Sequence, residues 1–362
     1  MSGAPDLGAI ARRFQLEGKF VRAVPYGSGH INDTYCALFD CGGASSRCIL
    51  QRINSRVFRH PAAVIQNMER VTAHLAARMT GEPDRERHVL ALIPERDGRA
   101  WHVDEAGSYW RALRFIENAH SHDEIESEQQ AFAAARAFGQ FQQMLIDLPA
   151  PRLQDTIPDF HHTPKRFAAL EEAIAQDAAG RVQNAESEIA FAVGRRAIIT
   201  TLLSAGLPER VTHNDTKFNN VLLDDQTGEA LCVIDLDTVM PGLAPCDFGD
   251  MVRTMTCPAR EDEQDLSRVS VQFPLFAAVA RGYLSTAGAF LAALEKELLV
   301  FAGKLICFEQ GVRFLTDYLA GDTYYKVHRP GQNLDRCRAQ FKLVASIETQ
   351  EAAMERLVRS IA

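Results

Sequence analysis

The sequence offers little that would direct the protein to a membrane or to nucleic acid. Its 362 residues carry a formal net charge of −8, which gives no electrostatic reason to expect an anionic partner. The most apolar segment, residues 273–294, is interrupted by Arg281 and is therefore a poor membrane span. These shortages predict a protein with no nucleic-acid partner and no membrane partner.

Cysteine pairs with the spacing of a zinc or redox site are also missing. None of the eight cysteines forms a C-x-x-C motif, so the expected thiols are reduced and mostly buried. The first residues show no basic segment followed by an apolar core, and we expect no secretory signal there. Together these features favour a cytoplasmic protein, and they carry no signal for an oligomeric state.

What the sequence does contain is two regions of different character. Hydrophobic residues make up 46% and charged residues 24%, as in ordinary globular proteins, and the length suits two lobes. The first region reads as strands around one helix, which the spacing of Val64, Met68, Val71 and Leu75 predicts over residues 60–79. Strands are predicted within residues 20–40, 47–53, 88–95, 100–105 and 108–118.

The second region, after about Asn118, is mainly helical. Apolar stripes at helical spacing occupy residues 138–148 and 298–319. The exception is a predicted β-hairpin, in which residues 219–224 and 230–235 flank a turn sequence, Asp-Gln-Thr-Gly. The sequence thus predicts an α+β fold with a β-rich N-terminal lobe, 1–117, and a helical C-terminal lobe, 118–362.

Polar residues gather at the ends of this hairpin. Asp215 and Asn220 precede or open the first strand, and Asp235 and Asp237 end the second. Antiparallel pairing brings those ends together. Carboxylate and amide oxygens are the ligands that Mg²⁺ prefers, so the hairpin predicts a magnesium site that leaves positions for phosphate and water.

These strings resemble known kinases. "HNDTKFNN" is similar to the kinase catalytic loop, and "VIDLD" is similar to the metal-binding strand end of aminoglycoside phosphotransferases and choline kinases. With "YGSGHINDTY", "ILQRIN" and "GVRFLTDYLAGDTYY", the chain resembles the N-acetylhexosamine 1-kinases over most of its length. The resemblance implies a bilobal protein-kinase-like fold, ATP as co-substrate, Mg²⁺ as cofactor and a small sugar as acceptor.

The resemblance also implies roles for the hairpin residues. Asp215 becomes the catalytic carboxylate, with Lys217 close enough to reach the transferred phosphate. Asn220 and Asp235 become the magnesium ligands. Asp237 either orients the metal site or touches sugar hydroxyls. By the same resemblance, His213, Asp247 and Asp250 brace the catalytic loop.

A nucleotide site is expected in the N-terminal lobe. Gly27 and Gly29 suit a turn whose backbone approaches phosphates. Typical kinases place a lysine on the third strand, but here the aligned position is Arg52, with Gln51 beside it. Either side chain could point inward, and Glu69 on the following helix is the candidate partner.

The segment between the lobes is expected to contact adenine. By analogy with kinases, backbone groups from Phe115 to Glu117 form this hinge.

The acceptor is expected to lie against the helical lobe. Arg313 and Tyr324 match positions that the sugar kinases use around the sugar, where arginine donates hydrogen bonds and tyrosine stacks. Two alternatives stay open at this point. One is an aminoglycoside, choline or homoserine type of phosphotransferase with another small acceptor. The other is an inactive nucleotide-binding regulator, suggested by the replaced strand lysine.

Overall fold

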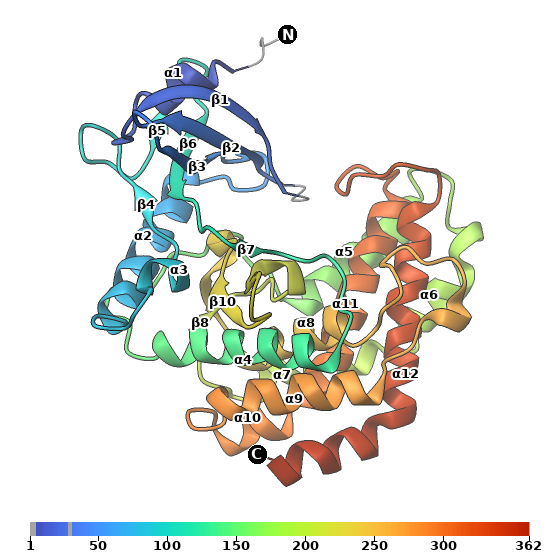
Figure 1. The fold of residues 1–362 in the computed structure, drawn as a ribbon. Coiled ribbons are helices and arrows are strands. Elements are labelled where there is room, and N and C mark those ends of the chain that lie inside the picture. The colour runs from blue at the N-terminus through green and yellow to red at the C-terminus, as the bar shows by residue number, and fades with distance from the viewer. Residues whose placement is uncertain (1–4, 28–30, 362) are drawn as a thin grey trace.

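In a computed structural model that describes residues 5–27 and 31–361, the N-terminal region forms one antiparallel sheet (Figure 1). Its strands run in the order β1-β2-β3-β6-β4, and β5 pairs with β6. The strands are β1 (Lys19–Pro25), β2 (Asp33–Asp40), β3 (Ser45–Arg52), β4 (Leu92–Ile93), β5 (His102–Val103) and β6 (Tyr109–Arg114).

The two faces of this sheet have different neighbours. Alternate residues of a strand point to opposite faces. Cys48 and Leu50 of β3 are buried in a small cluster that also includes Ile10 of α1 (Leu7–Ala11). Ile49 packs instead against the large core, which joins Met68 and Leu113 of the N-terminal region to residues of the C-terminal helices. One face of the sheet is therefore directed toward the rest of the molecule.

The C-terminal region is built from packed helices. In Figure 1, α4 lies above α9, and α11 lies beside α12. After α2 (Pro61–Arg78) and α3 (Arg85–His88), the helices are α4 (Glu128–Met144), α5 (Thr163–Gln176), α6 (Glu186–Val193), α7 (Thr201–Ser204), α8 (Ala244–Met255), α9 (Phe273–Ala287), α10 (Ala293–Glu297), α11 (Leu299–Leu319) and α12 (Gln332–Ile361). Short 3₁₀ turns are Gln183–Ala185, Arg196–Ile198, Phe218–Asn220, Leu236–Thr238 and Leu266–Arg268.

Two small sheets sit between the helices and the N-terminal sheet. The first has the order β10-β9-β7 and contains β7 (Ala119–His120), β9 (Val221–Asp224) and β10 (Ala230–Val233). The second pairs β8 (Arg210–Thr212) with β11 (Met240–Gly242). The chain segment between β8 and β9 is thus anchored at both ends by strands.

The structure confirms the predicted division into strands and helices, including the β9–β10 hairpin, with differences in detail. The predicted stripe over 138–148 is a helix only to Met144, because Leu145 leaves the helical conformation at the cap. The pairing of β7, β8 and β11 was not predicted, since these strands have only two or three residues each. Among the described residues, no helix is both long and apolar enough to cross a membrane.

The crossing of α4 and α9 depends on Gly282. A Cβ atom built there would lie 2.3 Å from the carbonyl oxygen of Phe132, a backbone atom that cannot rotate away. Gly282→Ala should lower the free energy of unfolding by about 1–3 kcal/mol through overpacking. Chemical denaturation measures the change. Arg281→Ala, an exposed neighbour on the same helix, is the control; equal stability of the two variants would contradict the close approach.

Candidate active site

A buried carboxylate organises the segment after β8. The two oxygens of Asp247, a residue on α8 with no exposed surface, accept hydrogen bonds from the backbone N–H groups of His213 (2.8 Å) and Asn214 (2.7 Å). The Gln142 side chain donates a third, at 2.6 Å. These bonds satisfy backbone groups that would otherwise be buried without partners. Asp247 therefore fixes the backbone immediately before Asp215.

Asp250 was predicted to share this task, and its contacts are different. Its Oδ1 accepts a hydrogen bond from Arg253 at 2.8 Å. Its Oδ2 is buried and has no hydrogen-bond partner among the described residues. His213, which is 1% exposed, supports the loop through a ring nitrogen 2.9 Å from the carbonyl oxygen of Ile234.

Asp215 stands at the end of this braced segment with two polar neighbours. The ammonium of Lys217 lies 2.8 Å from one of its oxygens, and the Asn220 side-chain amide lies 3.2 Å from the other. Burial would raise the pKa of Asp215, but the Lys217 charge outweighs it and the pKa is lowered. The lowered pKa keeps the carboxylate ionised at neutral pH, and its 21% exposed surface makes it accessible.

The hairpin places Asn220 next to the end of β10. The carbonyl oxygen of Asn220 accepts a hydrogen bond from the Ile234 N–H at 2.9 Å. Asp235 follows in a left-handed conformation, with φ of 57°, which turns the chain into the Leu236–Thr238 helical turn. Burial and the nearby charges of Asp237 and Asp215 raise the pKa of Asp235 to about 6. The site therefore carries an excess of negative charge.

Asp237 is held by the N-terminal sheet. It is 2% exposed, and one oxygen accepts a hydrogen bond from Arg111 at 2.5 Å. The other accepts one from the Asn32 side chain at 2.6 Å. The sequence allowed Asp237 to touch sugar hydroxyls or to orient the metal site, and this arrangement favours the second role.

Gln51 and Arg52, the two candidates for the position of the kinase lysine, lie on opposite faces of β3. Gln51 is on the face directed at the C-terminal region, where its oxygen accepts two hydrogen bonds from Arg111, at 2.9 and 2.7 Å. Arg52 lies on the other face, paired with Asp33 and 5.9 Å from the Trp110 ring. This geometry argues against Arg52 as a phosphate ligand.

Glu69, the candidate partner of Arg52, is exposed on α2. The charged partner that the structure gives Arg52 is Asp33 of β2. The two predicted residues are therefore not brought together, and the cation that Gln51 binds is the buried Arg111.

The predicted hinge residues join the end of β6 to β7. The Phe115 ring packs against Tyr26 with ring centroids 5.6 Å apart, and the Arg47 guanidinium lies 3.9 Å from the Phe115 ring centroid. The Glu117 carboxylate pairs with Arg47. Gly27, directly after Tyr26, has a φ of 80°, a conformation that glycine adopts readily. Gly29 lies outside the described residues.

Arg313 and Tyr324 lie together on the C-terminal side. The guanidinium of Arg313 is 5.8 Å from the ring centroid of Tyr325, whose ring packs edge-on against Tyr324 at 4.8 Å. Tyr324 is 60% exposed, and Arg313 donates a hydrogen bond to Gln310 at 3.0 Å.

A buried carboxylate fixes the loop that carries the two tyrosines. Asp317, 5% exposed on α11, accepts hydrogen bonds from the backbone N–H groups of Thr323, Tyr324 and Tyr325 at 2.8 to 3.0 Å. The Asn333 side chain donates a further bond at 2.8 Å. Asp317 thus fixes the backbone of the loop at residues 323–325.

The acidic side chains near Arg313 already have partners. Glu309 is 1% exposed and accepts hydrogen bonds from His161 (2.9 Å) and Thr163 (2.6 Å). Burial would raise the pKa of Glu309, but the bond to His161 reverses the shift and lowers it. Arg166, by contrast, keeps a buried Nε without a hydrogen-bond partner among the described residues.

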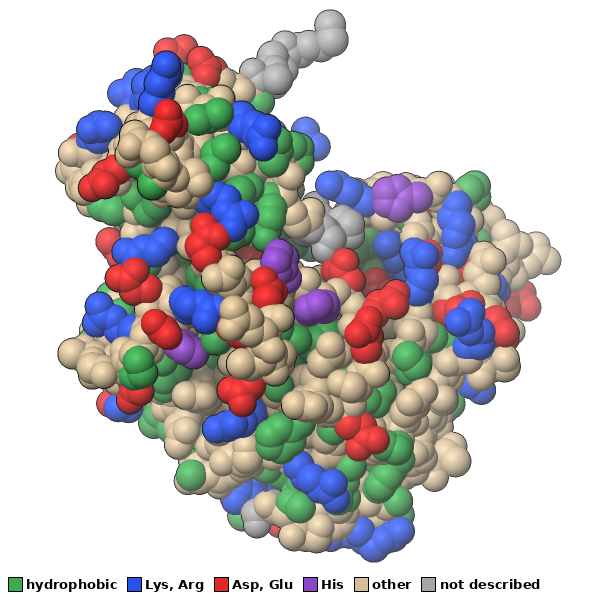
Figure 2. Space-filling view, in the orientation of Figure 1, with side chains coloured by type: hydrophobic (Ala, Val, Ile, Leu, Met, Phe, Trp, Pro, Cys, Tyr) green, Lys and Arg blue, Asp and Glu red, His purple; other side chains and the backbone are tan. Residues whose placement is uncertain are grey.

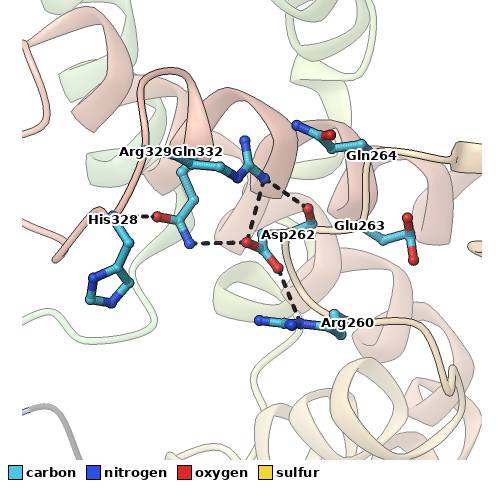
Figure 3. A pocket seen from close by; sticks show the side chains of 7 residues that line it. All are labelled: Arg260, Asp262, Glu263, Gln264, His328, Arg329 and Gln332. Atoms are coloured by element: carbon cyan, nitrogen blue, oxygen red, sulfur yellow. Dashed lines mark hydrogen bonds and ion pairs between the residues drawn. The ribbon is translucent and has the colours of Figure 1, made fainter.

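The rim beyond the tyrosines contains an open pocket (Figure 3). Arg329 and Gln332 point toward Asp262, and Gln332 donates to its carboxylate at 3.0 Å.

In Figure 2, the surface is hollowed between the N-terminal sheet and the C-terminal helices. Residues 5–27 and 31–361 contain no group of three or more His, Cys, Asp or Glu side chains that could hold a metal ion.

Sequence reasoning missed three residues of this site: Arg111, Asn32 and Asp317. Arg111 had a detectable signal, because it is a charged residue between the apolar Trp110 and Ala112 of a central strand. A charge buried at such a position is unfavourable unless an oppositely charged or hydrogen-bonding partner lies beside it. Asn32 and Asp317 had none, since their partners are distant in sequence or are backbone groups.

Removing the Asp317 carboxylate should release the tyrosine loop. In Asp317→Ala, the amides of residues 323–325 should exchange hydrogen about tenfold faster or more, because their acceptor is lost. Hydrogen-exchange mass spectrometry measures this. Lys304→Gln, on the same helix and paired with Glu351, is the control. Unchanged exchange in the 323–325 segment would show that other contacts order the loop.

The fold of this chain is similar to that of solved small-molecule kinases. The aminopropanol kinase associated with a microcompartment shares 16% identity over 96% of this chain and 98% of its own, with a TM-score of 0.59. An aminoglycoside phosphotransferase from Alicyclobacillus acidocaldarius shares 12% identity over 99% of this chain and 98% of its own, with a TM-score of 0.60. A choline kinase from Cryptosporidium parvum shares 12% identity over 98% of each chain, with a TM-score of 0.52. These similarities confirm the predicted kinase-like α+β fold. The model of the APH family, described as a phosphotransferase enzyme family, matches residues 22–283, and the chain therefore belongs to that family.

Proposed function

We propose that the protein is an ATP- and Mg²⁺-dependent kinase that phosphorylates the anomeric hydroxyl of an N-acetylhexosamine, N-acetylglucosamine or N-acetylgalactosamine. The product is the sugar 1-phosphate. Residues 1–117 form the nucleotide-binding lobe, and residues 118–362 carry the catalytic loop, the metal site and the acceptor site. The eight free cysteines support a cytoplasmic location, where thiols stay reduced.

The observation that carries the proposal is the accessible carboxylate of Asp215. It ends a segment fixed by Asp247, and it lies within 3.2 Å of Lys217 and Asn220. An ionised carboxylate held this way can accept the proton of an acceptor hydroxyl and orient its oxygen for attack. Lys217, whose side chain is 42% exposed, can donate to a phosphate oxygen.

The residues present fit a magnesium ion. The side-chain nitrogen of Asn220 donates to Asp215, which leaves its oxygen as the atom that can face a cation. Burial and the neighbouring carboxylates of Asp237 and Asp215 raise the pKa of Asp235, and a cation would relieve the repulsion between these carboxylates. Asn220 and Asp235 would hold the ion, and Mg²⁺ supplies neutralisation of charge on the ATP phosphates. Two protein ligands suit a metal that also takes phosphate oxygens.

The nucleotide is assigned to the face of the N-terminal sheet that carries Gln51. Backbone groups from Phe115 to Glu117 would pair with adenine, and the backbone at Gly27 would approach the phosphates. Tyr26, packed on Phe115, supports an aromatic wall beside this position.

The charge around Arg313 favours a neutral acceptor over a cationic one. Glu309 is occupied by His161 and Thr163, so it is not free to bind an amine. Arg313 has the neutral Gln310 and aromatic rings as neighbours, and it can donate to an acetamide carbonyl or a hydroxyl. Tyr324 and Tyr325 offer ring faces against which a pyranose can pack.

A cationic or amino-alcohol acceptor is the second candidate. The structurally similar proteins include an aminopropanol kinase, a choline kinase and an ethanolamine kinase. An ADP-release assay with ATP and Mg²⁺ should separate the candidates, using N-acetylglucosamine, N-acetylgalactosamine, glucose, galactose, choline, homoserine and kanamycin. Turnover confined to choline, homoserine or kanamycin would overturn the sugar acceptor, and tight ATP binding without turnover would favour a regulator.

Asp215→Asn should lower kcat by at least about 100-fold, because the amide cannot accept the proton. The fold should be retained, since asparagine still reaches Lys217 and Asn220, and an unchanged thermal midpoint would verify this. Retention of wild-type kcat in a folded variant would exclude Asp215 as the catalytic carboxylate.

Arg313→Ala should raise the KM for the sugar by about tenfold or more while the KM for ATP stays constant, because a charged hydrogen-bond donor to the acceptor is lost. Steady-state kinetics with each substrate varied in turn measures both constants. Arg268→Ala, whose exposed side chain pairs with Glu263, is the control. An effect of Arg313→Ala on ATP alone would contradict the assignment.

A further inference from the structure

We propose that Arg111 is a positioning residue that sets the metal-binding turn against the N-terminal sheet, in the place of the missing strand lysine. The inference rests on the proposed function, because it concerns how Asp235 is presented to the metal–nucleotide complex. Gln51 occupies the inward position of β3, and Arg52 faces the other way. The cation that reaches Asp237 therefore comes from the neighbouring strand, β6.

Arg111 is enclosed and fully oriented. It is 1% exposed, and its guanidinium donates two hydrogen bonds to the same oxygen of Gln51, at 2.9 and 2.7 Å. Gln51 is itself held by a bond to the Thr34 hydroxyl, at 3.0 Å. Three neighbouring strands, β2, β3 and β6, thus fix the direction in which the guanidinium points.

The guanidinium points at Asp237. The Arg111–Asp237 hydrogen bond is 2.5 Å long, and both side chains are almost completely buried, at 1% and 3% exposure. The second oxygen of Asp237 is bound by Asn32, whose own oxygen accepts the Asn54 backbone N–H at 3.0 Å. Both oxygens of this carboxylate are therefore tied to the N-terminal region.

The turn that carries Asp237 is tied equally firmly to the catalytic loop. The Thr238 hydroxyl donates to the His213 carbonyl at 2.7 Å, and the Asn214 side chain donates to the Thr238 carbonyl at 2.9 Å. Asp235 begins this turn. Arg111 and Asp237 consequently link the nucleotide-bearing sheet to the turn that presents Asp235.

This link has a specific consequence for charge. Without Arg111, Asp237 would be a buried and incompletely compensated anion two residues from Asp235, and such an anion is strongly unfavourable. The turn would have to shift to hydrate it, and Asp235 would move with the turn. The expected defect is therefore in binding of the metal–nucleotide complex and not in binding of the sugar.

The test compares Arg111→Gln and Arg111→Lys with the wild-type chain by isothermal titration calorimetry, using ADP with Mg²⁺ and ADP with EDTA. Arg111→Gln should weaken Mg·ADP binding by about tenfold or more and metal-free ADP by less than about twofold, as expected for loss of a charged hydrogen bond that acts through the metal site. Arg111→Lys keeps the charge and should give an intermediate Mg·ADP affinity. The control is Arg114→Gln on the same strand, whose exposed side chain pairs with Glu86.

Two results would overturn the proposal. One is wild-type affinity for Mg·ADP in folded Arg111→Gln; the other is an equal loss with and without Mg²⁺, which would mark a general structural role. If Arg111→Gln does not fold, Asp237→Asn provides a second test, since it breaks the charged link between Arg111 and the turn and should also weaken Mg·ADP binding selectively. Failure of the acceptor assignment would appear separately, as normal metal-dependent nucleotide binding without sugar turnover.

Discussion

The buried carboxylate of Asp247 is the constraint on which the rest of the active site depends. A charged group with no exposed surface is tolerated only when its oxygens are fully hydrogen-bonded. Here the donors are two consecutive backbone N–H groups and the Gln142 amide. Since those backbone groups directly precede Asp215, satisfying Asp247 determines where the proposed catalytic carboxylate points. The same physical demand repeats at Asp317, which orders the tyrosine loop.

The remaining charges follow a consistent arrangement. Buried or partly buried carboxylates on the acceptor side have partners, as Glu309 has His161. Asp237 is matched by Arg111 across the two regions. Asp235 is different, because its neighbours are other carboxylates and its pKa is raised. A buried acidic group at the end of a hairpin, with other carboxylates as near neighbours, is suited to recruit a cation together with phosphate.

Short-range patterns were enough to predict the fold and the hairpin that carries the candidate site. Hydrophobic periodicity predicted α2 and α11, and turn residues predicted the β9–β10 hairpin that joins Asn220 to the strand before Asp235. The orientation of β3 was not predictable, because Gln51 and Arg52 are adjacent and the sequence does not state which face of the sheet meets the C-terminal region. Arg111 was unassigned for the same reason. Its partner, Asp237, is 126 residues away, and only the assembled fold brings them together.

The acceptor is the part of the account that a single measurement tests most directly. Incubation with ATP, Mg²⁺ and N-acetylglucosamine, followed by ³¹P–¹H correlation NMR of the product, identifies the carbon that bears the phosphate. The account predicts a phosphorus signal coupled to the anomeric proton, as in a sugar 1-phosphate. A phosphate coupled to the C6 protons, or no phosphorylated sugar from an enzyme that phosphorylates an amino alcohol instead, would contradict it.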